Sequence, residues 1–106
     1  MLFDRKHKST DAVPPPPAAD EPVTRRRNKL AGMWAAELLG LIGHAAQDYA
    51  RELAHAHENT PDEHVVHKLA GDLKGKVSAH EIREKLAHFL HEAKRQIAEH
   101  RGKKSE

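Results

Sequence analysis

Residues 25–40 read RRRNKLAGMWAAELLG, and this run constrains the fold more than any other segment of the chain. From Leu30 onward the only charged residue before Gly43 is Glu37, so a helix here must bury most of its surface. Apolar residues recur every three or four positions, which is the spacing of a helical face: Leu30, Ala31, Trp34, Ala35, Leu38, Leu39, Leu41 and Ile42. The run predicts the central helix of a small bundle with Trp34 in the core. The alternative is that part of this apolar surface contacts a partner protein.

The N-terminal region is rich in proline. Residues 9–22, STDAVPPPPAADEP, contain five prolines, four of them consecutive at positions 14–17. Consecutive prolines favour polyproline II and exclude an α-helix. We therefore predict a flexible Pro-rich arm over residues 1–22, followed by a helical bundle over residues 23–101.

The bundle divides into four helices by apolar periodicity and by start and stop signals. Residues 60–63 (TPDE) and 78–81 (SAHE) have the form of capping boxes, which open helices. Gly75 is expected to end the third helix and Gly102 the fourth, leaving residues 102–106 as a disordered tail. The helices are expected at about residues 23–39, 44–57, 61–74 and 79–100. The predicted fold class is all-α, a small four-helix bundle with a disordered Pro-rich N-terminal arm.

The composition excludes several classes of function. The chain has no cysteine, so disulfide bonds and thiolate metal sites are impossible. Among its ten histidines, two pairs have i, i+3 spacing, but neither belongs to a metalloprotease motif, and we expect no metal site: His64 with His67 and His88 with His91. There is no glycine-rich phosphate loop, nucleophile elbow or plausible triad, so we expect no catalytic residues and no cofactor.

The same reasoning bears on location. The longest apolar run falls short of the ~20 residues that span a bilayer, and the first residues, MLFDRKHK, lack an apolar signal region. We expect a cytoplasmic protein without direct membrane insertion, monomeric when free.

A basic cluster carries the excess charge. Residues 25–29 contribute four positive charges, and the rest of the chain sums to −2, giving the formal net charge of +2. Such a cluster could contact the phosphates of nucleic acid. However, it lies across a helix start and has no interleaved aromatic residues, so a solvated first turn or an acidic protein partner is favoured. The candidate partner-binding residues of this cluster are Arg25, Arg26, Arg27, Asn28 and Lys29.

The segment RRNKLAGMWAAELLG resembles the signature of the zeta subunit, the inhibitor of bacterial F1-type ATP synthases. Later residues also fall where similar residues occur in that family, and the resemblance covers about residues 25–98. These supporting residues are Tyr49, Ala50, Arg51 and Glu52, the pairs Lys68-Leu69 and Asp72-Leu73, Ile82 with Arg83, and Glu92, Ala93, Lys94 and Gln96.

The resemblance implies a small all-helical bundle that attaches to the F1 head. In the family an N-terminal segment inserts at a catalytic interface against the rotor and blocks rotation in the hydrolytic direction. We therefore expect a zeta-like accessory protein that inhibits ATP hydrolysis by binding rather than by catalysis. Through F1 it would lie peripheral to the membrane, and we expect no nucleic-acid partner.

The N-terminal arm departs from the family pattern. Family members typically begin with FDDRExAFExKFAxD and continue as a helix, whereas this chain keeps Phe3, Asp4 and Arg5 and then turns to Lys, Ser and the prolines at 14–17. With Leu2, these three residues are the candidate partner contacts of the arm. Because the prolines forbid a continuous helix, we predict that inhibition is weak. The alternatives are a helical adaptor recognised through its Pro-rich arm, or a nucleic-acid binder that acts through residues 25–29.

Overall fold

The computed structural model describes residues 21–105, and all of the regular structure in that range is helical. The predicted all-α, four-helix fold class is confirmed. The first three helices begin and end within one residue of the expected bounds. Of the predicted arm, residues 1–22, the first twenty residues lie outside the described range. Below, 'the arm' means residues 1–20. The four helices are α2 (Val23–Leu38), α3 (Gly43–Ala56), α4 (Asp62–Leu73) and α5 (Ala79–Ser105).

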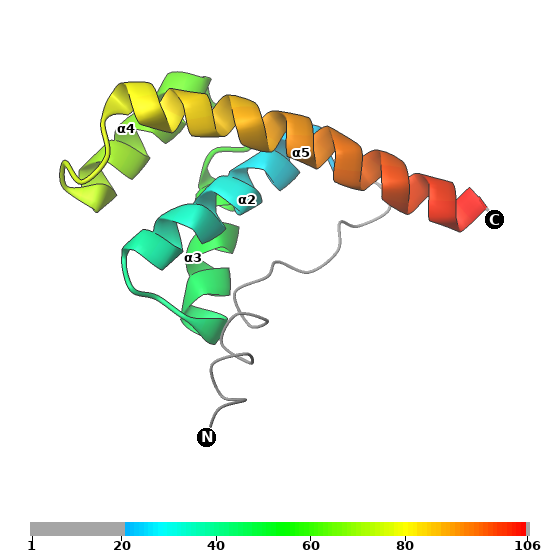
Figure 1. The fold of residues 1–106 in the computed structure, drawn as a ribbon, viewed down its shortest axis with the longest axis horizontal. Coiled ribbons are helices and arrows are strands. Elements are labelled where there is room, and N and C mark those ends of the chain that lie inside the picture. The colour runs from blue at the N-terminus through cyan, green and yellow to red at the C-terminus, as the bar shows by residue number, and fades with distance from the viewer. Residues whose placement is uncertain (1–20, 106) are drawn as a thin grey trace.

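Helix α2 is the centre of the bundle, as the sequence predicts. It contacts each of the other three helices, and Figure 1 shows α5 lying across α4 and α2. Trp34 of α2 is half-buried and packs against the core beside Phe89 of α5, with ring centroids 6.4 Å apart. The main core combines α2 with α3, α4, α5 and the turn before α5, and its buried members are Ala31, Ala35, Leu53, Val65, Val66, Leu69, Leu73, Val77, Ile82 and Leu86.

Small residues let α2 and α3 approach closely. Gly32 faces Ala50 so tightly that a Cβ on Gly32 would lie 2.6 Å from the Cα of Ala50. Met33 and Ala36 of α2 form a second buried cluster with Ala46 and Ala50 of α3. The run of small residues in α2 therefore serves helix packing, as the sequence suggested.

A polar contact joins α3 to α4. The Tyr49 hydroxyl donates a hydrogen bond to Asp72 Oδ2 at 2.6 Å, and Lys68 Nζ lies 3.2 Å from the same oxygen. Burial, together with the hydrogen bond to the Asp72 carboxylate, raises the pKa of Tyr49 above its ordinary value. Tyr49 and Asp72 both belong to the segments that resemble the zeta family, so these segments hold the two helices together.

The two predicted capping boxes differ in outcome. The backbone N–H of Glu81 donates to Ser78 Oγ at 3.1 Å, which confirms Ser78 as the cap of α5. The cap predicted at Thr60 is wrong: α4 begins at Asp62, one residue later than expected, and the Thr60 hydroxyl is buried without a hydrogen-bond partner.

The turns follow the glycines more closely. Gly40 and Gly75 have φ of +81°, in the left-handed region that glycine adopts readily. Gly75 follows the end of α4 as predicted.

Three other expectations are corrected by the structure. Helix α5 continues past Gly102 to Ser105, because one glycine costs a helix only about 1 kcal/mol; the predicted disordered tail is therefore wrong for residues 102–105. Leu38 and Ile42 do not join the core and are 39% and 57% exposed, because α2 ends at Leu38 and the chain turns at Gly40. Glu21, which we assigned to the arm, is buried in the bundle.

Candidate partner-binding site

The nine candidate partner-binding residues fall into two groups. Leu2, Phe3, Asp4 and Arg5 of the arm lie outside the described residues. The other five, residues 25–29, occupy the first two turns of α2. Arg26, Arg27 and Asn28 are buried, with 3%, 4% and 0% of their surface exposed. The expectation of a solvated basic first turn is therefore wrong for the middle of the cluster.

Arg27 is held by both α2 and α4. Its Nε and Nη2 donate hydrogen bonds to Asn28 Oδ1 at 3.0 and 2.8 Å. Its Nη1 lies 3.0 Å from Asp62 Oδ1, in the first turn of α4. A carboxylate in that turn is also favoured by the α4 dipole. Arg27 therefore ties the start of α2 to the start of α4.

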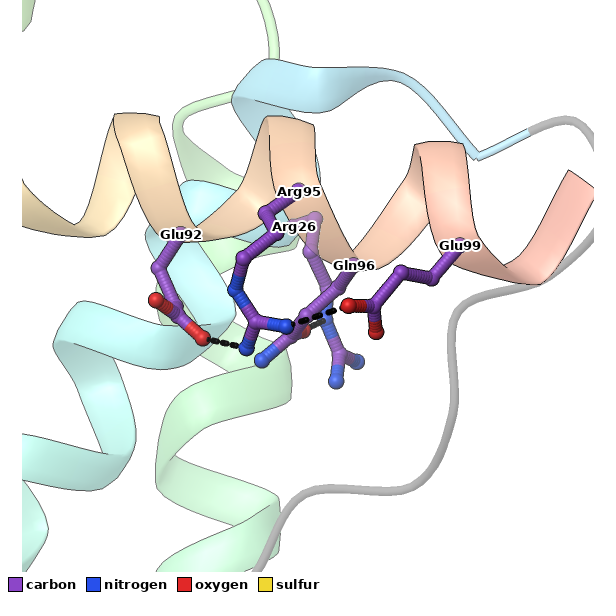
Figure 2. Close-up of polar contacts among 5 residues, drawn as sticks. All are labelled: Arg26, Glu92, Arg95, Gln96 and Glu99. Carbon is purple, nitrogen blue, oxygen red and sulfur yellow. Dashed lines mark hydrogen bonds and ion pairs between the residues drawn. The ribbon is translucent and has the colours of Figure 1, made fainter. Parts of the chain in front are cut away.

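Arg26 faces α5 instead. Its Nε donates to Gln96 Oε1 at 2.7 Å, and Figure 2 shows the two side chains meeting between the helices. Burial lowers the pKa of Arg26, and the negative charge of Glu21 partly offsets this effect. A buried guanidinium with these partners is a packing element and cannot reach the phosphates of a nucleic acid.

A second ion-pair group lies beside the Arg26–Gln96 contact on α5. Arg95 bridges Glu92 and Glu99, with Arg95 Nη1 2.6 Å from Glu99 Oε2 (Figure 2). The hydrogen bond from Arg95 lowers the pKa of Glu92 below its ordinary value. These side chains are partly or largely exposed and make a row of alternating charge along this part of α5.

The two outer residues of the cluster are also paired. Arg25 Nη2 lies 3.2 Å from Glu58 Oε1, just after the end of α3. Lys29 Nζ lies 3.5 Å from Oε2 of Glu21, the residue before the N-cap of α2. Both basic side chains keep about a third of their surface exposed, 38% for Arg25 and 27% for Lys29.

The cluster as a whole is therefore an internal junction. Its basic side chains reach four different parts of the fold, and the partners are Glu21, Glu58, Asp62 and Gln96. None of the four pairings is predictable from the sequence, because no partner lies at the i, i+3 or i, i+4 spacing that would signal a pair within one helix. Gln96 was noted only as part of the resemblance.

The remaining candidate features lie elsewhere on the surface. His88 packs edge-on against Phe89, with ring centroids 5.3 Å apart. In the part of the chain that the structure describes, no three His, Asp or Glu side chains are placed to hold a metal ion. Lys85 Nζ lies 5.7 Å from the centre of the Trp34 ring and covers its outer side.

A groove of about 290 Å³ runs between α2, α4 and α5. Arg27 and Arg83 border it, and both are already paired, with Asp62 and Glu63 respectively. Its apolar lining is Val66, Leu86, Ala87 and Leu90. Across residues 21–105 no helix is both long enough and apolar enough to pass through a membrane.

These features define a small all-helical protein whose signature basic segment is used for its own packing. A family model described as ATPase inhibitor subunit zeta matches residues 22–96, well over half of the chain. The chain therefore belongs to the zeta family of ATPase inhibitor subunits, a family of regulatory accessory proteins named for inhibition. No curated protein and no solved structure gives a significant match.

Proposed function

We propose that this protein binds the F1 head of an ATP synthase through its helical bundle and regulates ATP hydrolysis by binding, without catalysis of its own. The observation that carries the proposal is the family match over residues 22–96, which spans α2, α3, α4 and most of α5. The matched residues include the basic cluster and three of its partners, Glu58, Asp62 and Gln96. Apart from Glu21, the internal junction thus lies within the matched region.

The strength of inhibition depends on the arm. An inhibitory arm must become ordered in the cleft that it enters, at a cost of about 1–2 kcal/mol of backbone entropy per residue. Residues 14–17 cannot join a helix, and the arm offers few apolar anchors beyond Leu2, Phe3 and Val13. We therefore propose that the bundle binds F1 while the arm inhibits hydrolysis only weakly.

The residues proposed to touch F1 follow from this division. Leu2, Phe3, Asp4 and Arg5 remain the proposed contacts of the arm. Within the basic cluster, Arg25 and Lys29 retain exposed surface for a partner, whereas the buried Arg26, Arg27 and Asn28 support the fold.

The test measures the ATPase rate of purified F1 against added protein. Three chains are compared: the full chain, residues 21–106 alone, and a chimera in which residues 1–20 are replaced by a helical arm of the family type. A pull-down on F1 measures binding of each chain separately. All three should bind, the full chain should inhibit weakly, residues 21–106 should not inhibit, and the chimera should inhibit strongly.

Two results would overturn parts of the proposal. Failure of the full chain to bind F1 would refute the partner and would leave the adaptor hypothesis, in which residues 14–17 are recognised by another protein. Potent inhibition by the full chain that disappears in residues 21–106 would show that the Pro-rich arm is an effective inhibitor. Nucleic-acid binding no longer has a basis in the cluster, since two of its three arginines are buried.

A further inference from the structure

Glu21 is an unusual residue at the point where the arm joins the bundle. It precedes the N-cap Pro22, yet only 4% of its surface is exposed, while Pro22 itself is exposed. Carboxylates are rarely buried unless they are paired, because burial removes their hydration. The family match begins at residue 22, so Glu21 lies just outside the matched residues.

Glu21 interacts with residues in the first two turns of α2. Lys29 Nζ, eight residues further along the chain, lies 3.5 Å from Glu21 Oε2. Glu21 also acts electrostatically on Arg26, which in turn hydrogen bonds to Gln96 of α5. The Glu21 carboxylate therefore lies near basic groups of α2, one of which is hydrogen bonded to α5.

The figures place this contact, and with it the start of the described chain, on one side of the bundle. Figure 1 shows the described chain beginning beside the C-terminal half of α5. Figure 2 shows Arg26 in the same region, next to Glu92, Arg95, Gln96 and Glu99. Glu21, the first described residue, therefore lies on the α2–α5 side of the bundle.

We propose that Glu21, buried and paired with Lys29, is a positioning residue that sets the direction of the arm and thereby the strength of inhibition. The inference rests on the proposed binding to F1. An arm that starts from a fixed point has less freedom to lose when it enters a cleft, because part of its ordering is already present in the free protein. Releasing Glu21 should therefore weaken the contribution of the arm and leave the binding of the bundle unchanged.

The central variant is Glu21→Gln, which keeps the shape of the side chain and removes its charge. Lys29→Met removes the lysine that pairs with Glu21, and the Lys29 side chain is the less buried of the two. It serves as a second variant, in case Glu21→Gln unfolds. Glu63→Gln is the matched control, because it breaks the exposed Glu63–Arg83 ion pair between α4 and α5. Each variant is made in the full chain and in residues 21–106. The comparison gives a double-mutant cycle between the Glu21–Lys29 contact and the arm.

In the full chain, Glu21→Gln and Lys29→Met should each raise the concentration for half-maximal inhibition about tenfold, the equivalent of ordering one residue. Glu63→Gln should leave it unchanged. In residues 21–106, neither Glu21→Gln nor Glu63→Gln should alter affinity for F1 in the pull-down. Equal inhibition by Glu21→Gln and the unmodified chain would overturn the proposal. An equal loss of F1 affinity with and without the arm would also overturn it, because it would show a purely structural role.

A second readout does not depend on F1. The chain has no cysteine, so Ala18→Cys provides a single site for a nitroxide spin label. With Glu21 in place, the label should broaden the amide NMR signals of residues 92–99 on α5, and Glu21→Gln should reduce this broadening at least twofold. Equal broadening in the labelled chain with Glu21 and in the labelled Glu21→Gln chain would refute a positioning role for Glu21. If the unmodified chain fails to bind F1, the proposed function fails, and the spin-label result still decides whether Glu21 positions the arm.

Discussion

The close approach of α2 and α3 gives the sharpest test of the fold. In Gly32→Ala, the added Cβ would lie 2.6 Å from Ala50 Cα, 3.0 Å from Ala50 Cβ and 3.4 Å from Leu53 Cδ2. Carbon atoms in contact prefer ~3.5–4.0 Å, so the two helices must separate by about 1 Å. The nearest atom belongs to the backbone and cannot move aside as a flexible side chain would.

The magnitude follows from two opposing terms. Overpacking of a core costs about 1–3 kcal/mol, while alanine in place of glycine favours a helix by about 1 kcal/mol. Separation of the helices would also open the small second core around Met33 and Ala46. We therefore expect Gly32→Ala to lower the free energy of unfolding by about 1–2 kcal/mol, which for a domain of this size lowers the Tm by roughly 4–15 °C.

Gly71→Ala is the matched control. Gly71 also lies within a helix, α4, but a Cβ there would meet nothing within 4 Å. Only the helix propensity remains, so this variant should raise the free energy of unfolding by about 0.5–1 kcal/mol. Urea unfolding followed by circular dichroism measures both. A Gly32→Ala protein as stable as the unmodified chain, or two variants that shift stability in the same direction, would refute this account of the α2–α3 contact.

Three further predictions address individual contacts. Trp34→Ala should lower the free energy of unfolding by about 3 kcal/mol, the lower end for a large aromatic residue because Trp34 is half-buried; a variant that folds with unchanged stability and loses only F1 binding would make Trp34 a partner contact. Tyr49→Phe should lower the free energy of unfolding by about 1 kcal/mol near neutral pH, because it removes the hydrogen bond to Asp72. Because the pKa of Tyr49 is raised in the folded state, its contribution is full below the ordinary pKa of about 10 and is lost as pH rises above it. The two proteins should therefore converge in stability at alkaline pH, and tyrosinate absorbance of this single tyrosine should titrate above pH 10. Ser78→Ala should lower the free energy of unfolding by about 1 kcal/mol, because it removes the cap of α5. Thr60→Ala should leave it almost unchanged, because the Thr60 hydroxyl has no hydrogen-bond partner. Equal shifts of Tm for the two variants would contradict the assignment of the caps.

The fold was predictable from the sequence because its main signals are local. Helix starts and ends follow from proline, glycine and capping residues within a few positions of each boundary, as at Ser78 and Gly75. The apolar spacing in α2 identified the central helix. The local signals fail where they compete with others. Gly102 does not end α5, because its neighbours favour helix, and Thr60 lies one residue before the actual N-cap, Pro61.

The role of the basic cluster could not be predicted in the same way. Nothing local distinguishes a solvated run of arginines from one that is buried, since the outcome depends on whether acids and amides from distant segments reach it. Arg26 and Gln96 are 70 residues apart in the chain. Their contact exists only because α5 returns along α2, and that packing is a property of the whole fold.

The internal junction also explains how the bundle and the arm can vary independently. Three of the four junction partners lie within residues 22–96, and the fourth, Glu21, is the last residue before Pro22. All four junction partners therefore lie within the residues that the structure describes. A chain of residues 21–106 should therefore retain the stability of the full protein, with a Tm within about 2 °C, since changes outside packed contacts usually alter stability by less than ~0.5 kcal/mol. A large loss of stability on this truncation would mean that the arm packs on the bundle, and the separation of anchoring from inhibition would then fail. If the stability is retained, the arm can change from a helix-forming sequence to a Pro-rich one without cost to the fold, which is the pattern that this chain presents.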